Sequence, residues 1–290
     1  MKALATINFK GGVGKTTMVW CLGKVATEGR KANSVLMFDL DAQMSLTQAI
    51  TLNVDSGMLE QRFQKWYDTA VERKKTIFHA LDSYARPGAP HFDFGVGFDF
   101  IYKLSDRLHF VPSVEDLYWT ELEVYDRDGV KDFMRRLLGK IENSKKVPRY
   151  DYCLFDCPPS FSLLSYSVLA TCDLILIPVN PDFFASKGVN LILSTLRLRI
   201  EPHPVPKIGV FMNKGKTHGY PRFTYETQRY WDEVRRICDT AARRENLRVK
   251  CFDAKIPDRV SAKRAVTWGF VPGELIDPLQ ALWEEVRDYA

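Results

Sequence analysis

The octapeptide Lys10-Gly11-Gly12-Val13-Gly14-Lys15-Thr16-Thr17 lies between two apolar runs, residues 3–7 and residues 18–22. This order predicts a buried strand, a tight turn and a helix. The glycines allow backbone conformations in which several N–H groups of the turn point at one anion. The helix adds the positive end of its dipole, Lys15 can reach the terminal phosphates of a nucleotide, and the Thr16 hydroxyl can bind Mg²⁺. The sequence therefore predicts a phosphate-binding loop.

This loop departs from the usual P-loop pattern in two ways. Phe9 stands where that pattern has its first glycine, and Lys10 adds a second lysine. In both respects the octapeptide resembles the deviant Walker A motif of the ParA/MinD family of dimeric ATPases. The resemblance implies an α/β P-loop NTPase fold, with a mostly parallel twisted sheet and helices on both faces. It also implies ATP and Mg²⁺ as cofactors, and catalytic roles for Lys15 and for Lys10, which would reach the phosphates of a partner protomer.

Three aspartates follow two further apolar runs. One run ends in Asp39 and Asp41, and the other ends in Asp156. Strands of an open parallel sheet carry their sites at the carboxyl ends, so these carboxylates are expected beside the phosphate loop. The resemblance implies that Asp41 orients the attacking water. It also implies that Asp39 and Asp156 belong to the Mg²⁺ site together with Thr16. A helix cap would explain Asp39 and Asp41 without such roles.

The resemblance also indicates which residues bind the nucleotide. Asn213 ends the apolar run 207–212 and matches a residue that contacts adenine, whereas Pro257 matches a segment that borders the base. The residues expected to bind ATP are therefore Gly11, Gly12, Val13, Gly14, Lys15, Thr16, Thr17, Asn213 and Pro257.

The resemblance covers most of the chain, roughly residues 1–50 and 100–285. We therefore expect residues 1–290 to form a single ParA-like domain. A less typical helical and loop segment is expected at about residues 52–107, where apolar residues at helical spacing predict a helix near 58–71. This segment is a place where a surface for a partner could be added.

Positive charge is concentrated in the C-terminal half. The net charge is +5, but residues 197–264 contain seventeen Lys and Arg against eight Asp and Glu, a net of +9. On the helix predicted over residues 224–245, Arg229, Arg236 and Arg243 share one face. The opposite face is formed by Thr227, Trp231, Val234, Cys238 and Ala241. Such an arginine face can contact nucleic-acid phosphates without reading bases, although a solvated charged face explains it equally well.

Composition restricts the class of protein. Hydrophobic residues make up 46% and charged residues 27% of the sequence, as is usual for globular proteins. No apolar run approaches the ~18 residues of a membrane span. The six cysteines form no CxxC pair, which favours reduced cytosolic thiols over zinc or iron–sulfur sites. The helix predicted over residues 275–290 has an acidic polar face, so we expect it to pack on the core and not to bind a membrane.

Together the motifs favour a ParA-type ATPase in the cytoplasm, associated with the nucleoid. The family implies a homodimer that forms on ATP binding, binds DNA non-specifically and is released by hydrolysis, with a ParB-like partner protein stimulating that step. Its role would be plasmid or chromosome partition, or the positioning of another cargo. Three alternatives are a MinD-like membrane ATPase, a redox ATPase similar to nitrogenase iron protein, and a nucleotide-dependent scaffold with little turnover.

Overall fold

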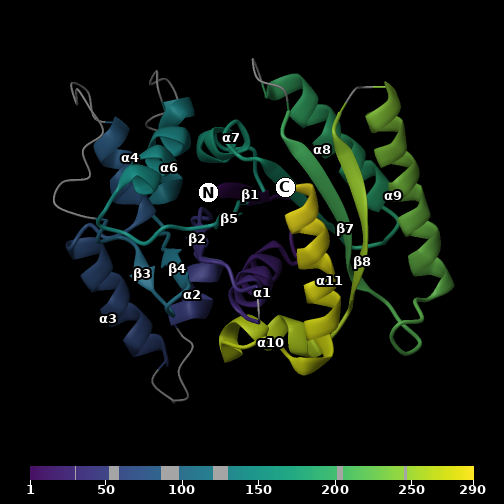
Figure 1. The fold of residues 1–290 in the computed structure, drawn as a ribbon, viewed down its shortest axis with the longest axis horizontal. Coiled ribbons are helices and arrows are strands. Elements are labelled where there is room, and N and C mark those ends of the chain that lie inside the picture. Colours follow the sequence, from purple (N-terminus) through teal and green to yellow (C-terminus); the bar gives the residue numbers. More distant parts are fainter. Residues whose placement is uncertain (30, 52–58, 86–97, 120–129, 201–204, 245–246) are drawn as a thin grey trace.

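The computed structural model describes residues 1–29, 31–51, 59–85, 98–119, 130–200, 205–244 and 247–290 (Figure 1). Eight strands of these residues form one sheet in the order β3-β4-β2-β5-β1-β6-β7-β8. All neighbouring pairs are parallel except β3 and β4. The strands are β1 (Lys2–Thr6), β2 (Val35–Asp39), β3 (Tyr102–Lys103), β4 (Leu108–Val111), β5 (Tyr152–Asp156), β6 (Leu174–Val179), β7 (Lys207–Gly215) and β8 (Val249–Pro257).

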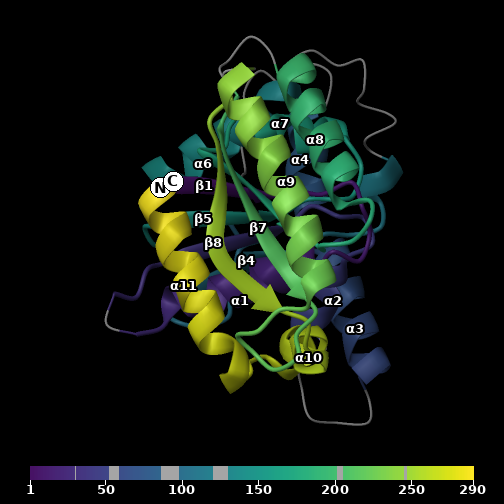
Figure 2. The same cartoon turned by 90° about the vertical axis from the view of Figure 1, so that its right-hand side faces the viewer.

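Helices cover both faces of the sheet (Figures 1 and 2). They are α1 (Lys15–Thr27), α2 (Ser45–Thr51), α3 (Leu59–Glu72), α4 (Ile77–Ala85), α6 (Phe133–Asn143), α7 (Leu163–Leu169), α8 (Ala185–Arg199), α9 (Tyr225–Arg244), α10 (Val260–Trp268) and α11 (Gly273–Tyr289). Helices α1, α10 and α11 contribute to one hydrophobic core, and α4, α6, α7, α8 and α9 contribute to the other. The predicted α/β fold, a mostly parallel sheet with helices on both faces, is therefore confirmed.

The central strands explain why the sequence shows uninterrupted apolar runs. All five residues of β2 and all six residues of β6 are buried. Strands of a parallel sheet lie between two helical layers, so both of their faces are mostly apolar, and the carboxylate of Asp39 comes only at the carboxyl end of β2. The same arrangement brings the carboxyl ends of β1, β2 and β5 together, since Asp156 is the register partner of both Thr6 and Asp39.

Two helices confirm predictions made from apolar spacing. Helix α9 buries Thr227, Trp231, Val234, Cys238 and Ala241, the five residues predicted to share its inner face. Helix α11 buries an apolar stripe that includes Leu279, Leu282 and Trp283, and it packs against α1 and β8. Its predicted place on the core is thus confirmed. None of the helices in the described ranges is long and apolar enough to cross a membrane.

The less typical segment contains the helix predicted near residues 58–71, which is α3, and a second helix, α4. The turn-rich stretch at residues 86–97 lies outside the described residues. Before α6, residues Val130–Asp132 form a 3₁₀ turn that leads directly into that helix.

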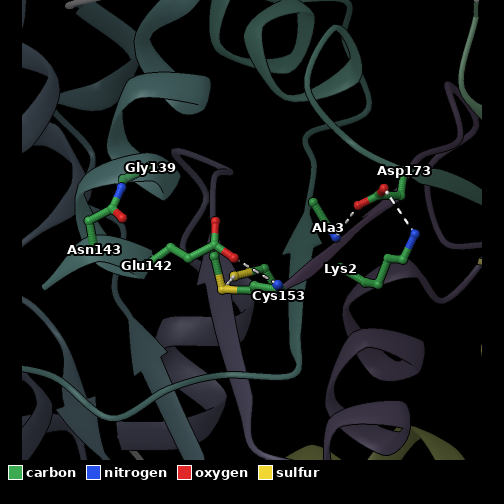
Figure 3. A network of polar contacts seen from close by, with 8 residues as sticks. Lys2, Ala3, Gly139, Glu142, Asn143, Cys153 and Asp173 are labelled. Atoms are coloured by element: carbon green, nitrogen blue, oxygen red, sulfur yellow. Dashed lines mark hydrogen bonds and ion pairs between the residues drawn. The ribbon is translucent and has the colours of Figure 1, made fainter.

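The amino end of β1 is fixed by polar contacts, which Figure 3 shows. Asp173 accepts a hydrogen bond from the backbone N–H of Ala3 at 2.8 Å and contacts the Lys2 ammonium at 3.4 Å. The terminal ammonium of Met1 pairs with Glu142 of α6 at 2.9 Å. These contacts lie at the end of β1 opposite to the phosphate loop, and they hold the strand that leads into it.

Strand β8 is an edge of the sheet, and its exposed backbone is covered by one side chain. The register of β8 shifts between the pairs Val210–Cys251 and Met212–Lys255, which indicates a bulge. Within it, the N–H groups of Asp253 and Ala254 donate to the two oxygens of the Glu285 carboxylate at 3.0 and 2.7 Å. A single carboxylate of α11 therefore satisfies two N–H groups that the ladder leaves unpaired.

We expect Glu285→Ala to lower the free energy of unfolding by about 1–2 kcal/mol, because it removes two charge-assisted hydrogen bonds at a partly exposed position. Urea denaturation monitored by circular dichroism measures this. The matched control is Glu284→Ala, which removes the neighbouring exposed carboxylate and should leave stability within about 0.5 kcal/mol of the parent. Equal effects of the two substitutions would contradict a capping role for Glu285.

Candidate functional site

The loop between β1 and α1 has the backbone that an anion site requires. Gly12 and Gly14 have φ values of 74° and 90°, in the left-handed region that favours glycine. A Cβ on Gly14 would lie 2.6 Å from Nδ2 of Asn213, so a side chain has no room there. Gly14 is also the residue that precedes the first turn of α1. The loop therefore leads directly into the positive end of a helix dipole.

Lys15 is directed toward a group of carboxylates. Its side chain is mostly buried, and Nζ donates to the backbone carbonyl of Asn8 at 3.1 Å. Burial lowers the pKa of Lys15, whereas the carboxylates of Asp156 and Asp41 oppose that shift. The ammonium of Lys15 therefore interacts electrostatically with Asp41 and Asp156, which lie at the ends of the two strands where the sequence predicts the site.

Asp156 is the most unusual group in this region. It is 1% exposed, and neither of its carboxylate oxygens has a hydrogen-bond partner among the described residues. Burial and the neighbouring Asp39 raise the pKa of Asp156 well above its usual value, while the Thr16 hydroxyl and the Lys15 ammonium lower it. The Thr16 hydroxyl is near enough to act on the carboxyl group but is not within hydrogen-bonding geometry of either oxygen. A buried carboxylate without donors is costly, and a cation would satisfy it.

The donor set fits a hard divalent cation that also binds a nucleotide. Mg²⁺ prefers oxygen ligands and is usually held by one or two carboxylates plus substrate phosphates. Asp156 and the Thr16 hydroxyl provide such oxygens beside the phosphate loop. Within the described ranges no cluster of three or more His, Cys, Asp or Glu could hold a metal by itself.

Asp39 differs from Asp156, although the two are register partners on adjacent strands. One oxygen of Asp39 accepts hydrogen bonds from the backbone N–H and the hydroxyl of Thr47, both at 2.7 Å. The other oxygen accepts from the N–H of Asp41 at 3.1 Å. Burial raises the pKa of Asp39 to about 6, and these hydrogen bonds oppose the shift. Asp39 therefore joins α2 to the strand end and orients Asp41, while its membership of the metal site remains a prediction.

Asp41 lies at the mouth of the site. It is half-buried, and one of its oxygens accepts a hydrogen bond from the N–H of Gln43 at 2.9 Å. Its charge acts on both Lys15 and Asp156. Lys15, Asp41, Asp156 and Thr16 are thus brought together by three strand ends, as the sequence indicates.

Lys10 is directed elsewhere. Its ammonium forms an ion pair with Asp182, in the loop between β6 and α8 of the same chain. Both side chains remain about half exposed, at 46% and 41%. Phe183 and Phe184, which follow Asp182, are 62% and 61% exposed. Lys10 therefore lies at the surface, and its ion-pair partner Asp182 directly precedes two exposed aromatic residues.

The two residues expected near adenine lie at the ends of neighbouring strands. Asn213 belongs to β7 and Pro257 ends β8, where it is paired with Gly215. Asn213 is 2% exposed, and its Nδ2 donates to the carbonyl of Val13 at 2.7 Å. In this structure Asn213 therefore supports the phosphate loop, and a contact with the base remains a prediction.

Sequence reasoning missed three contacts that shape the site. Thr47 holds Asp39, Asp182 pairs with Lys10, and Lys214 donates from Nζ to the carbonyl of Gly12. The sequence could have indicated Lys214, because this residue follows Asn213 at the carboxyl end of a predicted strand, where sites of parallel sheets lie. Nothing in the local sequence indicates the other two contacts.

The three arginines of the predicted nucleic-acid face are separate from this site. They lie on α9, which covers the sheet near its β7–β8 edge (Figure 2). Arg229, Arg236 and Arg243 are exposed, and exposed Asp232 and Asp239 stand between them. The guanidinium of Arg229 lies 4.7 Å from the centre of the Tyr230 ring. The arginines form the outward face of α9, and their role in binding DNA remains a prediction.

Comparisons with known proteins agree on the family. Residues 1–203 match the profile of a family described as an AAA domain. An uncharacterized protein of Mycobacterium tuberculosis is 30% identical over 204 residues, which are 69% of this chain and 54% of that protein. The chromosome-partitioning ATPase Soj of Treponema pallidum is 28% identical over 197 residues, 68% of this chain and 64% of that protein. The matches thus span between half and two thirds of these relatives.

Among solved structures, a complex of Cyanothece McdA with ATP superposes with a TM-score of 0.71. It is 19% identical and covers 100% of this chain and 96% of that chain, a likeness that shows the fold. The fold agrees with the deviant phosphate loop and with the similarity to Soj. The chain therefore belongs to the AAA-domain family, within the ParA/MinD type of P-loop proteins.

Proposed function

We propose that this protein is a Mg²⁺-dependent ATPase that forms a dimer with ATP, binds DNA non-specifically in that state and releases it after hydrolysis. The observation that carries the proposal is the buried carboxylate of Asp156, which lacks a donor and lies beside Thr16, Lys15 and the glycine loop. This arrangement is costly in the free protein and favourable when a metal–triphosphate is bound.

The residues of the chain divide the chemistry among them. Backbone N–H groups of the loop and Lys15 bind the phosphates, and Thr16 and Asp156 hold Mg²⁺, which supplies positive charge to the phosphoryl group in transfer. Asp41 orients the attacking water. Its position beside Lys15 supports this role, and its contact with the N–H of Gln43 fixes the carboxylate.

The dimer depends on Lys10. Lys10 is exposed, and so are Phe183 and Phe184, which follow its ion-pair partner Asp182. These exposed residues support a surface that a second copy covers. On dimer formation Lys10 exchanges Asp182 for the phosphates of the partner protomer. An exposed ion pair contributes only about 0–1 kcal/mol, so a triphosphate competes successfully for the lysine.

DNA binding depends on the dimer. Each α9 presents Arg229, Arg236 and Arg243, but Asp232 and Asp239 reduce the positive potential of a single helix. When a dimer carries two such faces, both can contact the same DNA, and avidity raises the affinity. Contacts to phosphates need no base recognition, so this binding is non-specific. The name of the Treponema relative, a chromosome-partitioning ATPase, supports a role in partition or cargo positioning. A ParB-like partner protein would stimulate hydrolysis, in the cytoplasm at the nucleoid.

The alternatives are less well supported by the structure. A membrane tether at the C-terminus conflicts with α11, whose apolar stripe is buried. A redox role needs accessible thiols, whereas Cys157 beside the site is 1% exposed. A scaffold with little turnover differs from the proposal only in its rate, which a phosphate-release assay with and without DNA measures.

We expect Asp156→Asn to abolish Mg²⁺-dependent ATP hydrolysis, with a loss of at least ~100-fold in kcat, because the metal loses its buried ligand. In the nucleotide-free protein without Mg²⁺, the same substitution should raise the free energy of unfolding. The pKa of Asp156 is raised on folding, so the parent loses stability as pH rises and the difference between the proteins is largest at high pH.

The matched control is Asp173→Asn. Unlike Asp156, Asp173 has a hydrogen-bond donor, the backbone N–H of Ala3. This control should retain hydrolysis and should not gain stability. Urea denaturation at pH 5.5 and pH 8 and a phosphate-release assay give both readouts. Hydrolysis by Asp156→Asn at the parental rate would contradict the assignment of the metal site.

We expect Lys10→Ala to remain a monomer with a non-hydrolysable ATP analogue and Mg²⁺, whereas the parent becomes a dimer. The reason is that the substitution removes the cation expected to bind the partner's phosphates. Size-exclusion chromatography with light scattering measures the mass of each species. The control Lys31→Ala removes an exposed lysine outside the site and should dimerise as the parent does. A dimer of the Lys10→Ala protein would refute the role of this lysine.

We expect tight DNA binding only with ATP, and we expect the triple substitution of Arg229, Arg236 and Arg243 by alanine to weaken it at least ~10-fold. Each phosphate contact that is lost should reduce the slope of log K against log salt by about 0.9. Fluorescence anisotropy over a salt series, with ATP, ADP or no nucleotide, measures this.

The control for the triple variant removes the same charge elsewhere, by alanine at the exposed residues Lys65, Arg135 and Lys145. Equal loss in both triple variants would show a general charge effect and not a surface on α9. Equal DNA binding by the parent in ATP and in ADP would contradict the nucleotide switch.

A further inference from the structure

The end of β7 contacts the phosphate loop at two successive peptide carbonyls. The Asn213 amide donates to the carbonyl of Val13 at 2.7 Å, and the Lys214 ammonium donates to the carbonyl of Gly12. The two donors are adjacent in the sequence, and so are the two acceptors. The pair therefore holds two consecutive peptide units of the loop from outside.

The orientation of these peptide units decides what the loop can bind. In a planar trans peptide, the carbonyl and the N–H of the following residue point in opposite directions. Fixing the carbonyl of Gly12 therefore fixes the N–H of Val13, and fixing the carbonyl of Val13 fixes the N–H of Gly14. With both carbonyls turned toward β7, both N–H groups are turned away from β7.

Lys214 adopts an uncommon backbone conformation at this position. Its φ is 55°, in the left-handed region that residues other than glycine, asparagine and aspartate rarely adopt. Its stem runs beside the loop, since a Cβ on Gly14 would lie 3.5 Å from Cε of Lys214. Strained residues of this kind persist where the surrounding contacts determine them, which often happens at functional sites.

From these contacts we propose that Lys214 is a positioning residue of the nucleotide site. Together with Asn213 it holds the carbonyls of Gly12 and Val13 and so presets the N–H groups of Val13 and Gly14 for a phosphate. This inference rests on the proposed function, because it assumes that the loop binds a nucleoside triphosphate. Lys214 touches the loop and not the reacting atoms, so it should govern binding more than the chemical step.

The test uses the full chain with Mg²⁺ and a fluorescent ATP analogue. Lys214→Met keeps an unbranched stem without the ammonium and should weaken the affinity for the analogue about tenfold, as the loss of one charge-assisted hydrogen bond predicts. In ATP hydrolysis KM should rise by a similar factor, while kcat at saturating ATP stays within about twofold of the parent. Lys214→Arg retains a cation and should recover most of the affinity.

The matched control is Lys216→Met, which removes an exposed lysine two residues further along and should bind as the parent does. Parental affinity in Lys214→Met would overturn the inference, and so would a fall in kcat at unchanged KM. If Lys214→Met does not fold, Lys214→Leu tests the same loss, because its side chain also lacks a donor. Failure of the parent itself to bind the analogue would instead refute the proposed function, so the two failures are distinguishable.

Discussion

A carboxylate buried without a hydrogen-bond donor is among the costliest groups that a folded chain can hold, and Asp156 is such a group. The parallel sheet imposes this position, because Asp156 ends a central strand beside Asp39 on the next one. The chain satisfies Asp39 with Thr47 and the backbone of Asp41, and it leaves Asp156 to Lys15 and Thr16. Of two neighbouring carboxylates, one thus has hydrogen-bond donors from the protein, and the other is the one to which the proposed function assigns a cation.

The lysines around the loop show a similar division of roles. Lys15 points inward to the carboxylates, Lys10 points outward to Asp182, and Lys214 approaches from β7 and contacts the loop carbonyl of Gly12. Each ammonium has a different neighbour, so the three cations are not interchangeable. In the proposed cycle the first binds the chain's own nucleotide, the second binds that of the partner, and the third keeps the loop in shape.

How much of this could be predicted from the sequence depends on the range of each interaction. Buried parallel strands give apolar runs, and α9 has a clear helical period, so the fold and the inner face of α9 follow from local pattern. Strand β8 gives no such signal, because it is a bulged edge strand with polar residues along its length. The contacts of Thr47 with Asp39 and of Asp182 with Lys10 have no local signal either. They join residues that only the folded chain brings near.

In the proposed function, the composition of α9 explains why dimer formation and DNA binding belong to one mechanism. The helix carries five arginines and four acidic residues, so a single copy has little net charge. A surface of this kind binds phosphates weakly, and its affinity falls further as salt screens it. A dimer carries two α9 faces, so once one face has bound DNA, the second is held near it at a high effective concentration. The affinity rises although neither face makes a new kind of contact. The proposed switch therefore needs no rearrangement of α9, because joining and separating two protomers changes the affinity for DNA by itself.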